Sequence, residues 1–66
     1  MPYVSVRIAK GDDVTPEKKR ELIKKVTDAV SETLNKKPSS TYVVIDEVDT
    51  DNWGVGGETL SVIRGK

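Results

Sequence analysis

The stretch TPEKKRELIKKVTDAVSETLN, residues 15–35, decides the fold because it has a helical period and lies between two strand-like segments. Thr15 is suited to the N-cap, and Pro16 to the first helical position, where its missing amide hydrogen is not needed. Glu17 places a negative charge in the first turn, which the helix dipole favours. Apolar and small side chains then recur at helical spacing on one face, at Leu22, Val26, Ala29, Val30, Thr33 and Leu34. The sequence therefore predicts an amphipathic helix of about five turns.

Strand-like segments flank this helix on both sides. Residues 3–9 alternate apolar and polar side chains, the period-two pattern of a half-buried strand. The segment NKKPSS, residues 35–40, ends the helix, and residues 42–45 are apolar on both faces, which predicts a central strand that is covered on both sides. A helical crossover of this length joins parallel strands, and its connection is right-handed.

The C-terminal segment is rich in glycine. Gly54, Gly56 and Gly57 are three glycines within four residues, which favours a tight hairpin or a bulge in which backbone approaches backbone. We expect residues 59–63 to follow as a short strand that reaches a neighbouring chain. The predicted fold is an α/β (α+β) single domain over residues 1–66, with a βαβ unit of parallel strands and a C-terminal β-hairpin. Its one helix can cover only one face of the sheet, so the other face must meet another subunit.

Composition removes several classes of function. The chain has no His and no Cys, which excludes zinc sites of the Cys/His type, Ser–His and Cys–His nucleophile pairs, and disulfides. Eleven basic residues balance eleven acidic ones, so no nucleic-acid partner is expected. No apolar run approaches the roughly 20 residues that cross a bilayer, and we expect a cytoplasmic protein without a membrane partner. One Trp, two Tyr and no Phe make a poor core for a lone chain, which favours oligomerisation.

Three further patterns are weak signals. The segment GVGG lacks the spacing of a phosphate-binding loop. The stretch DEVDTDNWG resembles the start of a calcium loop, but Trp53 fills its fifth position and Leu60 stands where a bidentate Glu belongs. The lysines of the helix lie mostly off its apolar face and indicate a solvated surface: Lys18, Lys19, Lys24 and Lys25. No metal site is expected.

Pro2 is the residue with the most chemical interest. A proline is tolerated at the start of a strand, where no ladder bond is lost. Removal of the initiator Met, which is usual before Pro, would turn its nitrogen from an amide into a basic secondary amine. Burial among apolar groups would lower the pKa of that amine, because it disfavours the charged form.

The opening MPYVSVRIAKG, the single helix and the block VVIDEVDTDNWGVGGE together resemble the 4-oxalocrotonate tautomerase family, over nearly the whole chain. The resemblance implies a βαβ protomer with a C-terminal hairpin, assembled as a homohexamer. It also implies cofactor-independent keto–enol tautomerisation of small 2-oxo or 2-hydroxy dienoic acids. Pro2, exposed by removal of Met1, would be the catalytic general base.

The residues for binding substrate depart from the family pattern. The family typically places one arginine just after the first strand and another at the start of the second. Here those places hold residues 10–13, beginning with Lys10, and Tyr42. Trp53 matches an aromatic residue of the family's active-site wall, although the role of an anchor for the hairpin suits it equally. Trp53, Tyr42 and Lys10 are thus the candidate substrate-binding residues.

Lys10 lies about 26 Å from Pro2 along an extended strand, at about 3.3 Å per residue. Within one chain the two residues cannot meet the same small substrate. A cation that serves Pro2 must come from a neighbouring chain or from the tail, and the candidates are Lys10, Arg7 and Arg64. The alternative to a tautomerase is a non-catalytic oligomeric member of the family, or a silent subunit.

Overall fold

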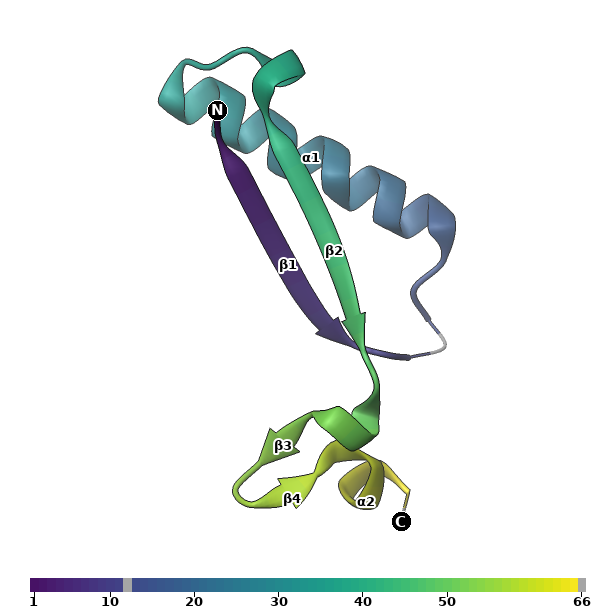
Figure 1. The fold of residues 1–66 in the computed structure, drawn as a ribbon. Helices are drawn as coiled ribbons and strands as arrows, with labels where there is room; N and C mark the ends of the chain where they lie inside the picture. The colour runs from purple at the N-terminus through teal and green to yellow at the C-terminus, as the bar shows by residue number, and fades with distance from the viewer. Residues whose placement is uncertain (12, 66) are drawn as a thin grey trace.

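The computed structural model describes residues 1–11 and 13–65. Along the chain, the helices and strands of Figure 1 are β1 (Tyr3–Ala9), α1 (Pro16–Leu34), the 3₁₀ turn η1 (Pro38–Ser40), β2 (Tyr42–Val48), the 3₁₀ turn η2 (Thr50–Asn52), β3 (Gly54–Val55), β4 (Glu58–Thr59) and α2 (Leu60–Arg64). The predicted strand, helix, strand and hairpin are all present. Among the described residues, no helix has both the length and the apolar character needed to span a bilayer.

Strands β1 and β2 pair in parallel, as predicted for a long helical crossover. Tyr3 lies opposite Tyr42 at one end and Ala9 opposite Val48 at the other. The backbone ladder extends past β1 at both ends, because the Tyr42 amide donates to the Pro2 carbonyl and the Lys10 amide donates to the Val48 carbonyl, each at 2.9 Å. The register of the two strands is therefore fixed along their whole length.

Helix α1 begins and ends where the sequence indicates. The Thr15 side chain accepts a hydrogen bond from the Lys18 amide at 3.2 Å, so the N-cap prediction is confirmed. Asn35 ends the helix in the left-handed conformation, with φ 57°, a backbone state that Asn tolerates better than most residues. On the exposed surface of the helix, the pKa of Glu21 is lowered. The larger cause is a hydrogen bond from Lys25, and the second is the positive charge of Lys25.

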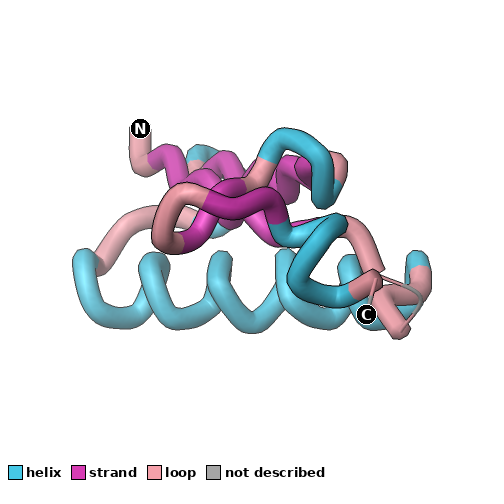
Figure 2. Tube along the Cα trace, turned by 90° about the horizontal axis from the view of Figure 1, so that it is seen from below, coloured by secondary structure: helices cyan, strands magenta, loops and turns pink. Residues whose placement is uncertain are grey.

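The helix covers one face of the two-stranded sheet and leaves the other open, as Figure 2 shows. Val26 and Val30 of the predicted apolar face are half-buried, whereas Leu34 is 56% exposed. The predicted apolar face of the helix is thus only partly covered within this chain. Lys19 also differs from the prediction of a solvated lysine face: it reaches Glu47 of β2, with Nζ 2.6 Å from Oε1.

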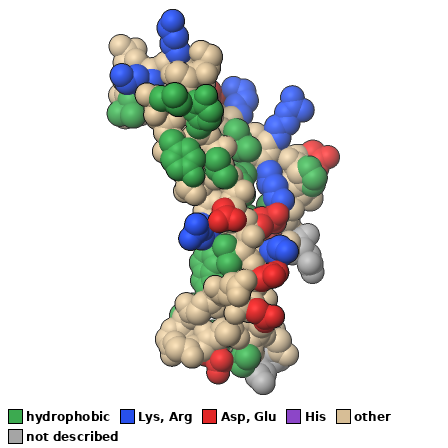
Figure 3. Space-filling model, viewed as in Figure 1, with side chains coloured by type: hydrophobic (Ala, Val, Ile, Leu, Met, Phe, Trp, Pro, Cys, Tyr) green, Lys and Arg blue, Asp and Glu red, His purple; other side chains and the backbone are tan. Residues whose placement is uncertain are grey.

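The prediction that the second strand is central and covered on both faces is wrong for the single chain. Tyr42 is 53% exposed and Val44 is 46% exposed, both on the open face of the sheet. Figure 3 views this face and shows apolar side chains gathered along the strands. Within the described part of the chain, only β1 pairs with β2, so each strand has one free edge.

The C-terminal segment folds beyond one end of the sheet (Figure 1). Gly56 and Gly57 form the two-residue turn between β3 and β4 with φ of 60° and 90°, which confirms the predicted hairpin. The strand predicted over residues 59–63 is wrong, because Leu60–Arg64 form the short helix α2. The Thr59 side chain accepts from the Val62 amide and caps this helix, so the local cap outweighs the strand preference of Val62 and its β-branched neighbour.

Candidate active site

Pro2 and Tyr42 lie together at the N-terminal end of the sheet. The Tyr42 amide donates to the Pro2 carbonyl at 2.9 Å, so the two residues are adjacent across the parallel pair. Pro2 is half-buried, and Met1 before it is 87% exposed. The carbonyl of Pro2, rather than its nitrogen, therefore anchors this residue to the sheet.

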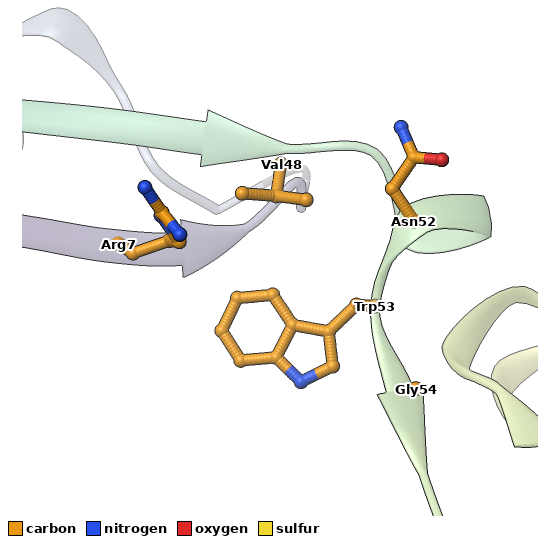
Figure 4. Close-up of a pocket in the computed structure, with 5 residues that line it drawn as sticks. All are labelled: Arg7, Val48, Asn52, Trp53 and Gly54. Atoms are coloured by element: carbon orange, nitrogen blue, oxygen red, sulfur yellow. The ribbon is translucent and has the colours of Figure 1, made fainter. Parts of the chain in front are cut away.

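Trp53 lies at the opposite end of the sheet, between η2 and β3. It lines an open pocket of about 270 Å³ together with Arg7, Val48, Asn52 and Gly54. Figure 4 shows the indole ring directed from the start of the hairpin back toward the ends of the strands, beside Arg7 and Val48. The volume is slightly below the range of about 300–1,000 Å³ that is usual for small-molecule sites.

Lys10 follows β1 near this second group but does not line the pocket. Its Nζ is 3.2 Å from the Asp49 Oδ1, and its carbonyl accepts a hydrogen bond from the Arg64 Nη1 at 3.3 Å. Two of the three candidate cations thus contact each other, and this contact joins the residue after β1 to α2. The third, Arg7, is the one that lines the pocket beside Trp53.

The candidate residues therefore form two groups within one chain. Five residue steps separate Pro2 from Arg7 on an extended strand, which is about 17 Å at about 3.3 Å per residue. A small dienoic acid cannot span that separation. A site that uses both groups has to combine the proline end of one protomer with the pocket end of another.

Sequence reasoning assigned no role to Asn52 or Asp46. Asn52 lines the pocket, and the Asp46 Oδ2 lies 3.2 Å from the Arg7 Nε. Asn52 could have been found from the sequence, because it directly precedes the candidate Trp53. The partner of Arg7 could be found only from the strand register, which places Arg7 opposite Asp46.

Comparison with known proteins agrees with the fold and with the sequence resemblance. A sequence model of the family described as "Tautomerase enzyme" matches residues 2–63. The chain is 54% identical to "Probable tautomerase K2" of Dickeya dadantii, over 97% of this chain and 94% of that protein. It is 43% identical to the 2-hydroxymuconate tautomerase of Bacillus subtilis, over 92% of this chain and 95% of that protein.

Among solved structures, the crystal structure of DmpI from Helicobacter pylori superposes with a TM-score of 0.87 and 38% sequence identity, and the match covers 98% of each chain. The fold, the family match and these identities agree with one another over almost the whole chain. The chain belongs to the tautomerase family, in the group of 4-oxalocrotonate tautomerases.

Proposed function

We propose that this protein is a cofactor-independent keto–enol tautomerase of small 2-hydroxy or 2-oxo dienoic acids, with the amine of Pro2 as its general base. Membership of the tautomerase family supports an isomerase in general terms. The dienoic acid class is proposed from the relative in Bacillus subtilis, which is a 2-hydroxymuconate tautomerase. The position of Pro2 in the structure supports its proposed role as the general base.

One observation carries the assignment of the base: Pro2 is fixed through its carbonyl. The hydrogen bond from the Tyr42 amide does not involve the Met1–Pro2 peptide, so cleavage of that peptide frees the nitrogen without releasing the residue. Met1 is 87% exposed, and its removal sacrifices little packing in the protomer. The result would be a secondary amine held at the end of a paired strand.

The chemistry follows from one basic nitrogen at a fixed position. The neutral amine takes the proton of the substrate's 2-hydroxyl, the electrons move through the conjugated system, and the same nitrogen returns the proton to a carbon. No atoms are gained or lost, as an isomerisation requires. Negative charge that develops on the substrate's oxygens needs hydrogen-bond donors or cations nearby, and a neighbouring protomer would supply them.

The amine can be tested by comparing the processed protein with a form that carries one extra residue before Pro2. Intact mass identifies the amino terminus, and turnover of 2-hydroxymuconate is followed by absorbance. We expect the extended form to lose at least about 100-fold in kcat/KM, the usual contribution of a general base. Circular dichroism and sedimentation serve as controls, since the extension should leave fold and assembly unchanged.

Pro2→Ala is the matched variant, because it retains a free amine of a different class. It should keep part of the activity that the extended form loses. Equal rates for the processed and extended forms would falsify the role of Pro2 and favour the alternative, a non-catalytic oligomeric member of the family.

A further inference from the structure

The pocket beside Trp53 has one basic residue, Arg7, among its lining residues. Arg7 lines it from β1, whereas the Lys10 ammonium is paired with Asp49 and the Arg64 guanidinium donates to the Lys10 carbonyl. Of these three cations, Arg7 is the one whose side chain faces the cavity. An anionic ligand in this pocket would therefore meet Arg7.

Asp46 forms an ion pair with the inner nitrogen of the Arg7 guanidinium, and both side chains are exposed. Arg7 and Asp46 are opposite each other in the parallel register, and the Nε lies 3.2 Å from the Asp46 Oδ2. A guanidinium has five N–H donors in a planar fork, so a contact through Nε leaves the terminal nitrogens for a second oxyanion. Their spacing suits the two oxygens of a carboxylate.

Trp53 gives the pocket a flat apolar wall next to this fork. Its indole is directed toward Arg7 and Val48, as Figure 4 shows. A planar conjugated ligand gains from contact with an aromatic face, and aromatic pairs favour offset stacking. The Arg7 guanidinium and the flat indole of Trp53 together favour a ligand that is both anionic and planar.

We propose that Arg7, positioned by Asp46, is the residue that recognises the carboxylate of a planar conjugated acid in the Trp53 pocket. This inference rests on the proposed function for its substrate class. It adds to that function the residue that determines specificity for the anion. Arg7 binds the carboxylate, Trp53 covers the conjugated plane, and Asp46 is a positioning residue that does not touch the ligand.

Binding of cis,cis-muconate, which is planar and cannot undergo the keto–enol reaction, tests the proposal without any turnover. Trp53 is the only tryptophan in the sequence, so its indole N–H resonance reports on the pocket directly. We expect a saturable shift of that resonance with muconate and none with the dimethyl ester. Arg7→Met should weaken the binding at least about tenfold, as expected for loss of charge-assisted hydrogen bonds.

Two further variants separate recognition from structure. Asp46→Asn keeps an oxygen acceptor for Nε but removes the negative charge that opposes the ligand, so muconate should bind at least as tightly as to the wild type. Arg20→Met removes an exposed positive charge on α1 and should leave binding unchanged. Sedimentation of each variant confirms that the assembly is intact.

Equal weakening by Arg7→Met and Asp46→Asn would overturn the proposal, because the pair would then be structural. Binding of the ester as tight as that of muconate would also overturn it. If Arg7→Met changes the assembly, the Asp46→Asn result and the ester comparison still decide. If muconate does not bind, the comparison of the processed and extended forms still tests Pro2. If Pro2 is not the base, the muconate titration still tests Arg7, so the two proposals can fail separately.

Discussion

At the scale of single residues, Pro2 has two chemical states that differ by one peptide bond. In the processed protein, kcat/KM should rise with pH through a single ionisation, because only the neutral amine accepts a proton. Half-burial disfavours the charged form, so we expect this ionisation below the ordinary pKa of an α-amino group. A pH–rate profile of the processed enzyme measures it. A profile that is flat over this range would contradict an amine base.

Lys19 and Glu47 form an ion pair that joins α1 to β2. Their Nζ and Oε1 are 2.6 Å apart, and the side chains are only 30% and 29% exposed. Lys19→Met leaves a half-buried carboxylate without its partner, and we expect a loss of about 1–2 kcal/mol in the free energy of unfolding. Urea denaturation measures this loss.

The control for that variant is Lys24→Met, which breaks an exposed pair within the helix, where Lys24 Nζ is 2.9 Å from Asp28 Oδ2. Pairs of this kind contribute up to about 0.5 kcal/mol. Equal losses for the two variants would show that the ion pair to β2 adds nothing beyond a surface pair.

Residues that act through local chemistry could be predicted from the sequence. The Thr15 cap is an example, because it depends only on neighbours along the chain. The partners of Arg7 and Lys19 could not be predicted, since both ion pairs join segments that are distant in the sequence. Such pairs depend on the strand register and on where the helix lies over the sheet.

At the scale of elements, the hairpin turn depends on two glycines in different backbone states. Gly56 has φ 60°, which Asn also adopts at low cost, whereas Gly57 has φ 90°. A Cβ at either position meets no atom within 4 Å, so any effect of substitution is conformational rather than steric. Gly57→Ala should destabilise the protein by about 1 kcal/mol or more, and Gly56→Asn by much less. Thermal denaturation of the two variants distinguishes them, and similar melting temperatures would contradict this difference between the two positions.

Element types were predictable where periodicity was long and ambiguous where it was short. Helix α1 and strands β1 and β2 agree with the patterns of the sequence. Residues 60–64 differ, because five residues are too few to show a period, and β-branched side chains among them favoured a strand. The Thr59 cap was the signal for a helix there.

At the scale of the whole molecule, the protomer is open and extended. None of the described residues is fully buried, and the radius of gyration is 15.0 Å, against about 11 Å for a compact domain of this length. The chain extends over 45 × 24 × 14 Å. The sequence indicated this through its poor aromatic content and the single helix for a two-faced sheet.

We therefore expect a homo-oligomer, most simply the hexamer that the family resemblance implies, with the open face of the sheet in an interface. Tyr3, Tyr42 and Val44 are 64%, 53% and 46% exposed on that face, and their burial between copies would supply apolar area that the lone chain lacks. Val44→Asp places a charge at the centre of this face. Its desolvation should dissociate the assembly. Because none of the residues that the structure describes is buried within one chain, helical circular dichroism should fall as well.

Sedimentation velocity at micromolar concentration measures the assembly, and six protomers of 7.3 kDa give the expected mass. Glu32→Lys is the control, because it changes charge at an exposed position of α1 and should leave the assembly intact. A Val44→Asp variant that keeps the wild-type mass would show that the open face is not an interface. A wild-type protein that sediments as a folded monomer would contradict the oligomer itself, and with it the requirement that one protomer's proline end meets another's Trp53 pocket.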